Sequence, residues 1–193
     1  MSFVGWDACF PTIIGRYNRI DLLEDVQKVF DKTVQNNPNV GLNTNEYFHY
    51  ITDDDFDVLP DFLKKEFAKN VIELLKEVCN IDNELKLTTS WFTREAAGSH
   101  HHVNSYYSAV FYLVDGAEIE FTQKQKAIYV ESTEFSINSA SSVVYTANKG
   151  DLLIFPSDVT HRALPYEGKR HSLAMNFMPT GKHGCFDSTY TYV

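Results

Sequence analysis

Hydrophobic positions recur at helical spacing in two segments of the N-terminal half of the chain. Residues 21–36 carry an apolar stripe behind Asp21, which we expect to cap the helix. Residues 60–79 repeat the pattern, with lysine and glutamate on the opposite face. Because that polar face mixes charges of both signs, we expect the apolar stripe to pack on a sheet rather than on a membrane. The pattern predicts two amphipathic helices.

After residue 83 the spacing changes to the alternation that is typical of strands. About eight short segments rich in β-branched and aromatic residues are separated by Gly, Asn, Asp or Pro turns. They read ELKLTTSWFT, YYSAVFYLV, AEIEFT, AIYVE, SSVVYT, DLLIFP, HRALPY and RHSLAMNFM. Strands at this spacing, preceded by helices, indicate a mainly β fold: a cupin-like jelly roll, or double-stranded β-helix, flanked by two helices.

Length and composition favour one such domain. A chain of 193 residues can hold one domain with a hydrophobic core, and its 14 phenylalanines and 11 tyrosines suit the interior of a β-sandwich. We expect a single domain over 1–193, with a helical support at 1–83, a jelly-roll core at 84–178 and a tail at 179–193.

Charge and cysteine usage exclude several function classes. A net charge of −9, from 26 acidic and 17 basic residues, would repel a phosphate backbone and argues against a nucleic-acid partner. Cys9, Cys79 and Cys185 are far apart, so neither a disulfide framework nor a zinc ribbon is predicted. The sequence has no segment typical of a secretory leader or a membrane span, and we expect a soluble cytoplasmic protein without a membrane partner.

Three consecutive histidines interrupt a segment that otherwise reads as strand. Alternate side chains of a strand share a face, so His100 and His102 can point to one side while His101 points away. A first-row transition metal would need a third ligand, and His161 is the natural candidate because it follows an apolar strand that ends at Pro156. Strand-end loops are where binding sites are commonly built.

The last predicted strand brings an unusual arginine among apolar residues. Every second position of this strand holds Arg170, Ser172, Ala174 and Asn176, so the four side chains share one face. An arginine that faces into a sheet needs an anion. Each residue alone would more often be an ordinary surface residue. Their order along the chain favours a common site.

These motifs resemble those of the iron(II)- and 2-oxoglutarate-dependent oxygenases, specifically a small bacterial and phage-type group that is distantly similar to prolyl hydroxylases. That group has a tryptophan strand, then H-x-H-P-x-S-x-x-S-G-V-Y-Y, G-x-L-x-x-F-P-S-x-x-x-H and R-x-S-x-x-x-N. The corresponding residues here are Ser90 and Trp91, then 100–112, 150–161 and 170–176. Val103 replaces the usual proline and Ala109 the usual glycine.

The second metal ligand departs from the superfamily pattern. The usual triad is H-x-D followed by a distant histidine, and His102 stands where the aspartate would be. Three arrangements remain: His100, His102 and His161 together; His100 and His161 with water; or a shifted register in which His102 and Asn104 take the H-x-D positions. We favour the first, because imidazole is a good iron ligand and a neutral amide is a poor one.

The resemblance implies an enzyme, a hydroxylase-like dioxygenase with Fe(II) as cofactor and 2-oxoglutarate and dioxygen as co-substrates. It would hydroxylate an unactivated C–H bond of a peptide side chain or small metabolite, with release of succinate and CO2. Arg170, Ser172 and Tyr112 would bind 2-oxoglutarate, and no catalytic residue beyond the metal site is implied. Pocket-wall candidates are Trp91, Asn104 and Asn176. The oligomeric state stays open, a homodimer included.

A cupin is the main alternative. Cupins also bind metal through H-x-H and a later histidine, and act as isomerases, as dioxygenases without 2-oxoglutarate or as binding modules. They usually have a glutamate shortly after H-x-H, where this chain has no acid in 105–108. That absence, together with Arg170 and Ser172, favours the oxygenase. A structural or carbohydrate-binding jelly roll without metal is the second alternative.

Overall fold

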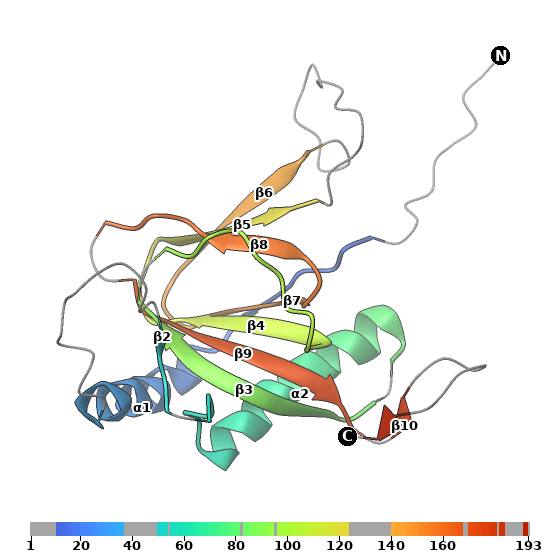
Figure 1. The fold of residues 1–193 in the computed structure, drawn as a ribbon, viewed down its shortest axis with the longest axis horizontal. Coiled ribbons are helices and arrows are strands. Elements are labelled where there is room, and N and C mark those ends of the chain that lie inside the picture. The colour runs from blue at the N-terminus through green and yellow to red at the C-terminus, as the bar shows by residue number, and fades with distance from the viewer. Residues whose placement is uncertain are drawn as a thin grey trace.

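Two antiparallel sheets and two helices form the part of the chain that the structure describes (Figure 1). The computed structural model describes residues 11–36, 50–53, 55–81, 83–94, 96–123, 140–167, 170–180, 182–183 and 191–192. The larger sheet has the order β1-β7-β4-β9-β3-β2, with the bounds Gly15–Asn18, Asp151–Pro156, Tyr107–Tyr112, Ser172–Pro179, Leu85–Thr93 and Tyr50–Ile51. The smaller sheet has the order β6-β5-β8, with the bounds Ser142–Ala147, Ala117–Thr122 and Thr160–Ala163. A separate ladder pairs β10 (Lys182–His183) with β11 (Thr191–Tyr192).

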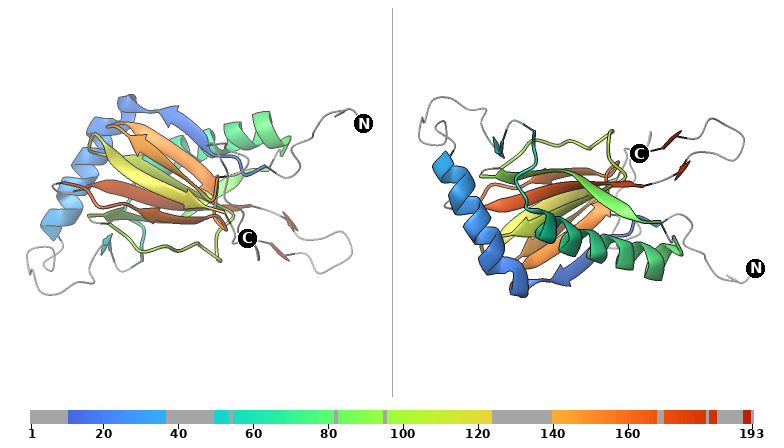
Figure 2. Two further views of the ribbon diagram at one scale, coloured as in Figure 1. Left: turned by 90° about the horizontal axis from the view of Figure 1, so that it is seen from above. Right: turned by 90° about the horizontal axis from the view of Figure 1, so that it is seen from below.

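Both helices cover the face of the larger sheet that is turned away from the smaller sheet (Figure 2). α1 spans Leu23–Asn36 after a 3-10 turn at Ile20–Leu22, and α2 spans Asp61–Cys79. None of the helices in the described residues combines the length and the apolar content that a bilayer crossing requires.

The first helix begins differently from the expectation. Asp21 does not cap α1, because the chain enters the helix through the 3-10 turn and the Asp21 carboxylate bonds instead to Arg19 at 2.8 Å. Arg19 also reaches Asn70 and Glu66 on α2, so this corner ties the two helices together.

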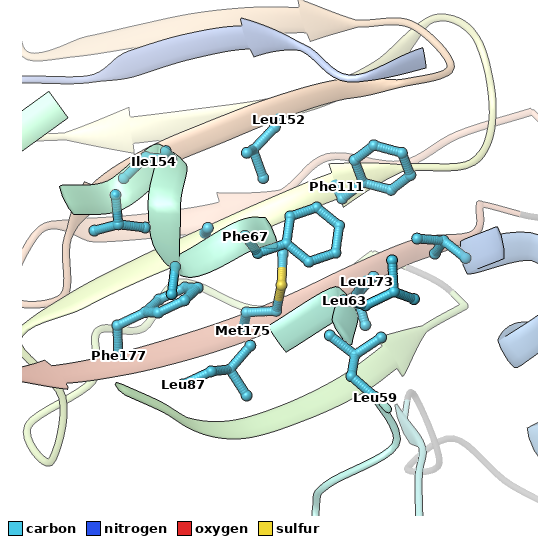
Figure 3. Close-up of a cluster of buried hydrophobic side chains, with 14 of the residues drawn as sticks. Leu59, Leu63, Phe67, Leu87, Phe111, Leu152, Ile154, Leu173, Met175 and Phe177 are labelled. Atoms are coloured by element: carbon cyan, nitrogen blue, oxygen red, sulfur yellow. The ribbon is translucent and has the colours of Figure 1, made fainter. Parts of the chain in front are cut away.

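The main core lies between α2 and the central strands of the larger sheet (Figure 3). Alternation along β4 and β9 sends every second side chain towards the helices, where Phe111, Met175 and Phe177 pack around Phe67. A second cluster, with Val110, Tyr112, Ile119, Phe121, Leu153 and Phe155 among its members, fills the space between the two sheets. The larger sheet is therefore buried on both faces.

The predicted class, mainly β with two helices, is confirmed, and β5 and β7 have the predicted bounds. β1 was not predicted, because GRYN has no clear apolar alternation. The AIYVE segment lies outside the described residues. The expected strand around the histidines is wrong: His100 forms only an isolated bridge with His161, and the backbone bends at Val103 and Asn104. The division of the domain at residues 83 and 178 stays a prediction.

Candidate metal centre and anion pocket

A cavity between the two sheets collects most of the polar residues that the sequence singled out. Its walls are largely apolar and include Val110, Ile119 and Phe155 from three different strands. The polar residues that line it are Thr93, His100, His102, Ser108, His161, Arg170, Ser172 and Asn176. An apolar pocket with a few convergent polar groups is the usual form of a small-molecule site.

Three histidines meet at one end of this cavity. The ligand atoms of His100, His102 and His161 all lie within 4.8 Å of one another, a spread that small rotations of the rings would close on a shared ion. The ring centroids of His100 and His161 are 4.5 Å apart, and that of His102 lies 5.2 and 5.3 Å from them. The three imidazoles can bind one metal ion together.

Backbone hydrogen bonds fix the two segments that carry these histidines. The amides of His100 and His161 each donate to the other's carbonyl at 2.9 Å, and the amide of His102 donates to the Ser157 carbonyl at 2.8 Å. His161 itself sits on β8, which pairs with β5 through Phe121. Residues about 60 positions apart in the sequence are thus held in register by the backbone.

The hydrogen bonds of two rings identify their free nitrogens. Nδ1 of His100 lies 2.7 Å from the Gly98 carbonyl, and Nδ1 of His161 lies 2.9 Å from the Val159 carbonyl. A carbonyl oxygen only accepts, so Nδ1 must carry the hydrogen in both rings. In the neutral form of each ring, Nε2 then carries the lone pair, which is the arrangement that metal-binding histidines need.

Burial also favours the neutral form of two of the imidazoles. Desolvation, with the neighbouring histidines adding to it and the hydrogen bond to the Val159 carbonyl opposing it, lowers the pKa of His161 to about 4. Desolvation, with His100 and His101 adding to it, likewise lowers the pKa of His102 to about 4. Since a metal binds the neutral form of imidazole, both side chains are in the ligand form near pH 7.

Arg170 occupies the other part of the cavity as a buried cation without a carboxylate partner in the described residues. It is 2 % exposed, and its Nη1 donates to the carbonyls of Glu118 at 2.7 Å and Leu164 at 3.4 Å. Its Nε has no hydrogen-bond partner among the described residues. Burial lowers the pKa of Arg170, so an anion in the cavity would stabilise its charged form.

Tyr112 lies beside this guanidinium, and Ser172 lines the same cavity. Arg170 Cζ lies 5.6 Å from the Tyr112 ring centre, and the buried Tyr112 hydroxyl has no hydrogen-bond partner among the described residues. Burial raises the pKa of Tyr112 to about 12, so the phenol stays a donor near neutral pH. Ser172 Oγ lies 2.6 Å from Thr93 Oγ1 at the cavity wall. Arg170 and Tyr112 thus lie beside one another, and each has a buried polar atom that lacks a hydrogen-bond partner of suitable distance and angle among the described residues.

The three wall candidates do not share one location. Trp91 lines the cavity, with its ring 5.9 Å from that of His102, and Asn176 lines the cavity from β9. Asn104 is exposed and does not line the cavity, because the backbone bends after His102 and the strand alternation is lost. Asn104 also lies outside the histidine cluster, which counts against the shifted register.

Several cavity residues were not singled out from the sequence. Ser108 and Thr93 line the cavity, and Ser157 bonds to Ser108 just behind it. The signal was present for Ser108, which is a polar residue in the otherwise apolar run YYSAVFY of a strand with every residue buried. Thr93 gave no signal, because threonine is common in strands.

A family model matches the segment of the chain that lines this cavity. Residues 89–177 match the family model described as "Putative 2OG-Fe(II) oxygenase". No curated protein matches the sequence.

Solved structures share the fold at low sequence identity. AviO1 from Streptomyces viridochromogenes Tue57 is 10% identical, with a TM-score of 0.57 over 85% of this chain and 88% of that one. HygX from Streptomyces hygroscopicus, solved with nickel and 2-oxoglutarate bound, is 13% identical, with a TM-score of 0.55 over 88% of this chain and 83% of HygX. A Pseudomonas putida prolyl-4-hydroxylase is 14% identical, with a TM-score of 0.53 over 87% and 93%.

These similarities confirm the predicted jelly roll, and the family match agrees with the resemblance seen in the sequence motifs. The family match covers Trp91, the three histidines, Arg170 and Asn176. Residues 89–177, which contain all the site residues described above, match the 2OG-Fe(II) oxygenase family model over slightly less than half of the chain.

Proposed function

We propose that this protein is an Fe(II)- and 2-oxoglutarate-dependent oxygenase that hydroxylates an unactivated C–H bond of a small metabolite or a peptide side chain. One observation carries the proposal. Three imidazoles that can share a metal ion and a buried arginine without a carboxylate partner in the described residues line the same cavity. A metal ion would suit the histidines, and a dianion that chelates the metal could also reach Arg170 with its second carboxylate.

The donor set fits iron with one departure. Imidazole suits iron, and the tautomers of His100 and His161 leave Nε2 available. His102 takes the place of the carboxylate in the usual two-histidine, one-carboxylate triad. A ferrous ion held by three neutral ligands keeps one more positive charge than in that triad. We infer that this centre binds anionic ligands more tightly than the usual triad does. We also infer that its affinity for Fe(II), relative to that for Ni(II) or Zn(II), is lower than in the usual triad.

The part of the cavity that Arg170 lines fits the distal carboxylate of 2-oxoglutarate. Arg170 supplies a charge and a planar set of donors, and its Nε lacks a partner among the described residues. The Tyr112 hydroxyl lacks one too, and Ser172 adds a hydroxyl at the cavity wall. A buried polar group without a partner costs about 1–3 kcal/mol, so a carboxylate that satisfies these groups would be stabilised.

The remaining wall residues would hold the substrate and exclude water. When bound, iron supplies the activation of dioxygen, and the overall reaction converts R–H, 2-oxoglutarate and O2 into R–OH, succinate and CO2. Val110, Ile119, Phe155 and Trp91 provide a wall with little polar surface beside the histidines. Water exclusion favours reaction with the substrate over loss of the oxidant to solvent. Hydroxylation is proposed by analogy with the Pseudomonas putida prolyl-4-hydroxylase, and the epimerase SnoN and the carbocyclase SnoK share the fold to a similar degree.

Succinate release under aerobic conditions tests this function. Protein supplied with Fe(II), 2-oxoglutarate and ascorbate is expected to release succinate slowly alone, and faster with a substrate from a panel of peptides and metabolites. The His100→Ala variant is expected to release none, and His101→Ala is the matched control because His101 is exposed in the same tripeptide. Metal binding without any succinate release would instead indicate a cupin-type metal protein.

A further inference from the structure

Behind the cavity wall, three serine hydroxyls and one carboxamide form a continuous chain that is buried except at Ser105, which is partly exposed. Asn176 on β9 contacts Ser108 on β4 at 2.8 Å, and Ser108 contacts Ser157 at 2.8 Å. Ser157 contacts Ser105 at 2.9 Å, and Ser105 lies 2.9 Å from the Tyr107 carbonyl oxygen. The chain therefore starts at the cavity wall and ends on a backbone acceptor.

Counting hydrogens gives this chain a direction. Each hydroxyl has one hydrogen, and a carbonyl oxygen only accepts. Ser105 also lies 3.2 Å from the Phe177 carbonyl oxygen, so its one hydrogen is shared between two carbonyls, and it accepts from the Phe177 amide at 3.3 Å. Each contact between two hydroxyls then carries a hydrogen only if Ser157 donates to Ser105 and Ser108 donates to Ser157. Ser108 then has no hydrogen left, and the contact with Asn176 must be donated by the carboxamide nitrogen.

The opposite direction leaves close oxygen pairs without a hydrogen. If Ser108 donates to Oδ1 of Asn176, as the carboxamide is drawn, then either the Ser108–Ser157 contact or the Ser105 contact with Tyr107 has none. A half-turn of the carboxamide exchanges Oδ1 and Nδ2 with almost no change of shape, so the hydrogen-bond network has to assign them. The count favours the turned form.

The turned form places an acceptor at the cavity. Asn176 is 6 % exposed and lines the cavity, and its carboxamide makes no hydrogen bond in the described residues besides that to Ser108. Ser157 also accepts the His102 amide through its carbonyl, so the loop that carries a candidate metal ligand holds the chain in position. Asn176 Oδ1 then has a fixed orientation and no partner.

We propose that Asn176 is a specificity-determining residue whose carboxamide oxygen accepts a hydrogen bond from the primary substrate. The proposal rests on the proposed function for the existence of that substrate. A carbonyl-type oxygen repels a carboxylate, so this atom does not serve 2-oxoglutarate, whose anionic groups suit Arg170 and the metal. The substrate class is a molecule with an N–H or O–H group beside the carbon that reacts. A site built to accept such a group rejects analogues that lack it, because its buried acceptor is left unpaired.

Side-chain amide exchange tests the direction of the chain. In ¹⁵N-labelled protein with Zn(II) added, the Asn176 amide pair is assigned by its loss in Asn176→Ala. We expect its hydrogens to exchange with water at least tenfold more slowly than those of Asn104, the exposed asparagine nearby. Ser108→Ala is expected to bring the rate close to that of Asn104. An Asn176 pair that exchanges as fast as Asn104 in the wild type overturns the proposal.

Co-substrate binding separates the two ligands that Asn176 could serve. Asn176→Ala, with thermal unfolding checked against the wild type, is expected to bind 2-oxoglutarate within about threefold of the wild-type affinity. A loss of tenfold or more would mean that the carboxamide serves the co-substrate, and would overturn the proposal. If the wild-type protein binds no 2-oxoglutarate, the proposed function is wrong. The exchange measurement would still determine the orientation of the Asn176 carboxamide.

Methylated substrates test the substrate class. For any compound of the panel that the wild type turns over, the N-methyl or O-methyl counterpart at the neighbouring donor is expected to lose at least tenfold in succinate release. That difference is expected to shrink to within about threefold in Asn176→Ala. Equal turnover of both compounds by the wild type overturns the assignment.

Discussion

The two faces of strands β4 and β9 are equally buried and chemically opposite. Towards the helices they present apolar side chains, such as Phe111, Met175 and Phe177, each fully buried. Towards the cavity the same strands present Ser108 and Asn176, which are also at most 6 % exposed. Burial alone does not separate a core from a site in this protein. The separation lies in whether each buried group already has its partner.

The side chains on the helix-facing side find their packing partners within the protein, whereas some polar groups on the cavity-facing side lack a hydrogen-bond partner among the described residues. Phe111 packs with its ring centre 5.5 Å from that of Phe67, and apolar contact needs nothing further. On the other side, Arg170 Nε and the Tyr112 hydroxyl are buried without a hydrogen-bond partner in the described residues. Unsatisfied buried polar groups are destabilising, so their presence beside the cavity makes that face the candidate for binding a ligand.

The largest expected effect is a loss of stability from a substitution on the helix-facing side of the sheet. Phe111→Ala removes a fully buried ring between α2 and the sheet and should lower the free energy of unfolding by about 3–5 kcal/mol. Urea denaturation followed by circular dichroism measures this. The variant should still bind metal at low temperature while folded, since Phe111 points away from the histidines. A loss below about 1 kcal/mol would show that the helix-facing side is not the core.

The next effect is on metal affinity. His102→Ala removes one of three imidazoles and should weaken binding by more than about 100-fold, since loss of a mere supporting residue often costs about 10–100-fold. Calorimetric titration with Ni(II) measures the affinity. His101→Ala is the control and should stay within about threefold. Retained affinity in His102→Ala, with loss in Asn104→Ala, would instead establish the shifted register.

Arg170 should affect the co-substrate and spare stability. Arg170→Gln should weaken 2-oxoglutarate binding to the Ni(II)-loaded protein by about 10–100-fold, because a charge-assisted bond to a carboxylate is lost. Without ligand, the melting temperature should hold or rise, since a desolvated cation without a carboxylate partner in the described residues is removed. A clear fall in the melting temperature of the ligand-free variant would mark Arg170 as structural. Arg170→Lys should restore only part of the affinity.

The smallest effect is expected for a single neutral hydroxyl. Ser172→Ala removes the contact with Thr93 and one donor near Arg170, and should weaken 2-oxoglutarate binding by up to about tenfold. Unfolding should change by no more than about 1 kcal/mol. If the affinity is unchanged, Ser172 supports only Thr93 and does not reach the co-substrate.

The sequence predicted the parts of the fold that periodicity determines. The α2 segment and strands β5 and β7 have strong patterns and appear with the predicted bounds or within one residue of them. The start of α1 and the irregular segment around His100 were predicted less well. Both depend on contacts with distant residues, Arg19 with α2 and His100 with His161, which no local pattern encodes.

The site was predictable where residue type and spacing carry chemistry. The histidine pair with His161, and Arg170 two residues before Ser172, were found because metals and anions need those groups. The chain through Ser108 and Ser157 was not found, because serine has many ordinary roles and the hydrogen count requires distances. Asn104 was misplaced because strand alternation was extended past His102 into a bend.

An anaerobic titration tests the central claim most directly. Protein loaded with Fe(II) and titrated with 2-oxoglutarate without oxygen should develop the weak visible charge-transfer band of the chelate. The band should saturate at one equivalent in the wild type, weaken in Arg170→Gln and be absent in His100→Ala. A flat spectrum with Fe(II) demonstrably bound would contradict the account, because the histidines and Arg170 would then not hold one metal and one 2-oxo acid in a shared cavity.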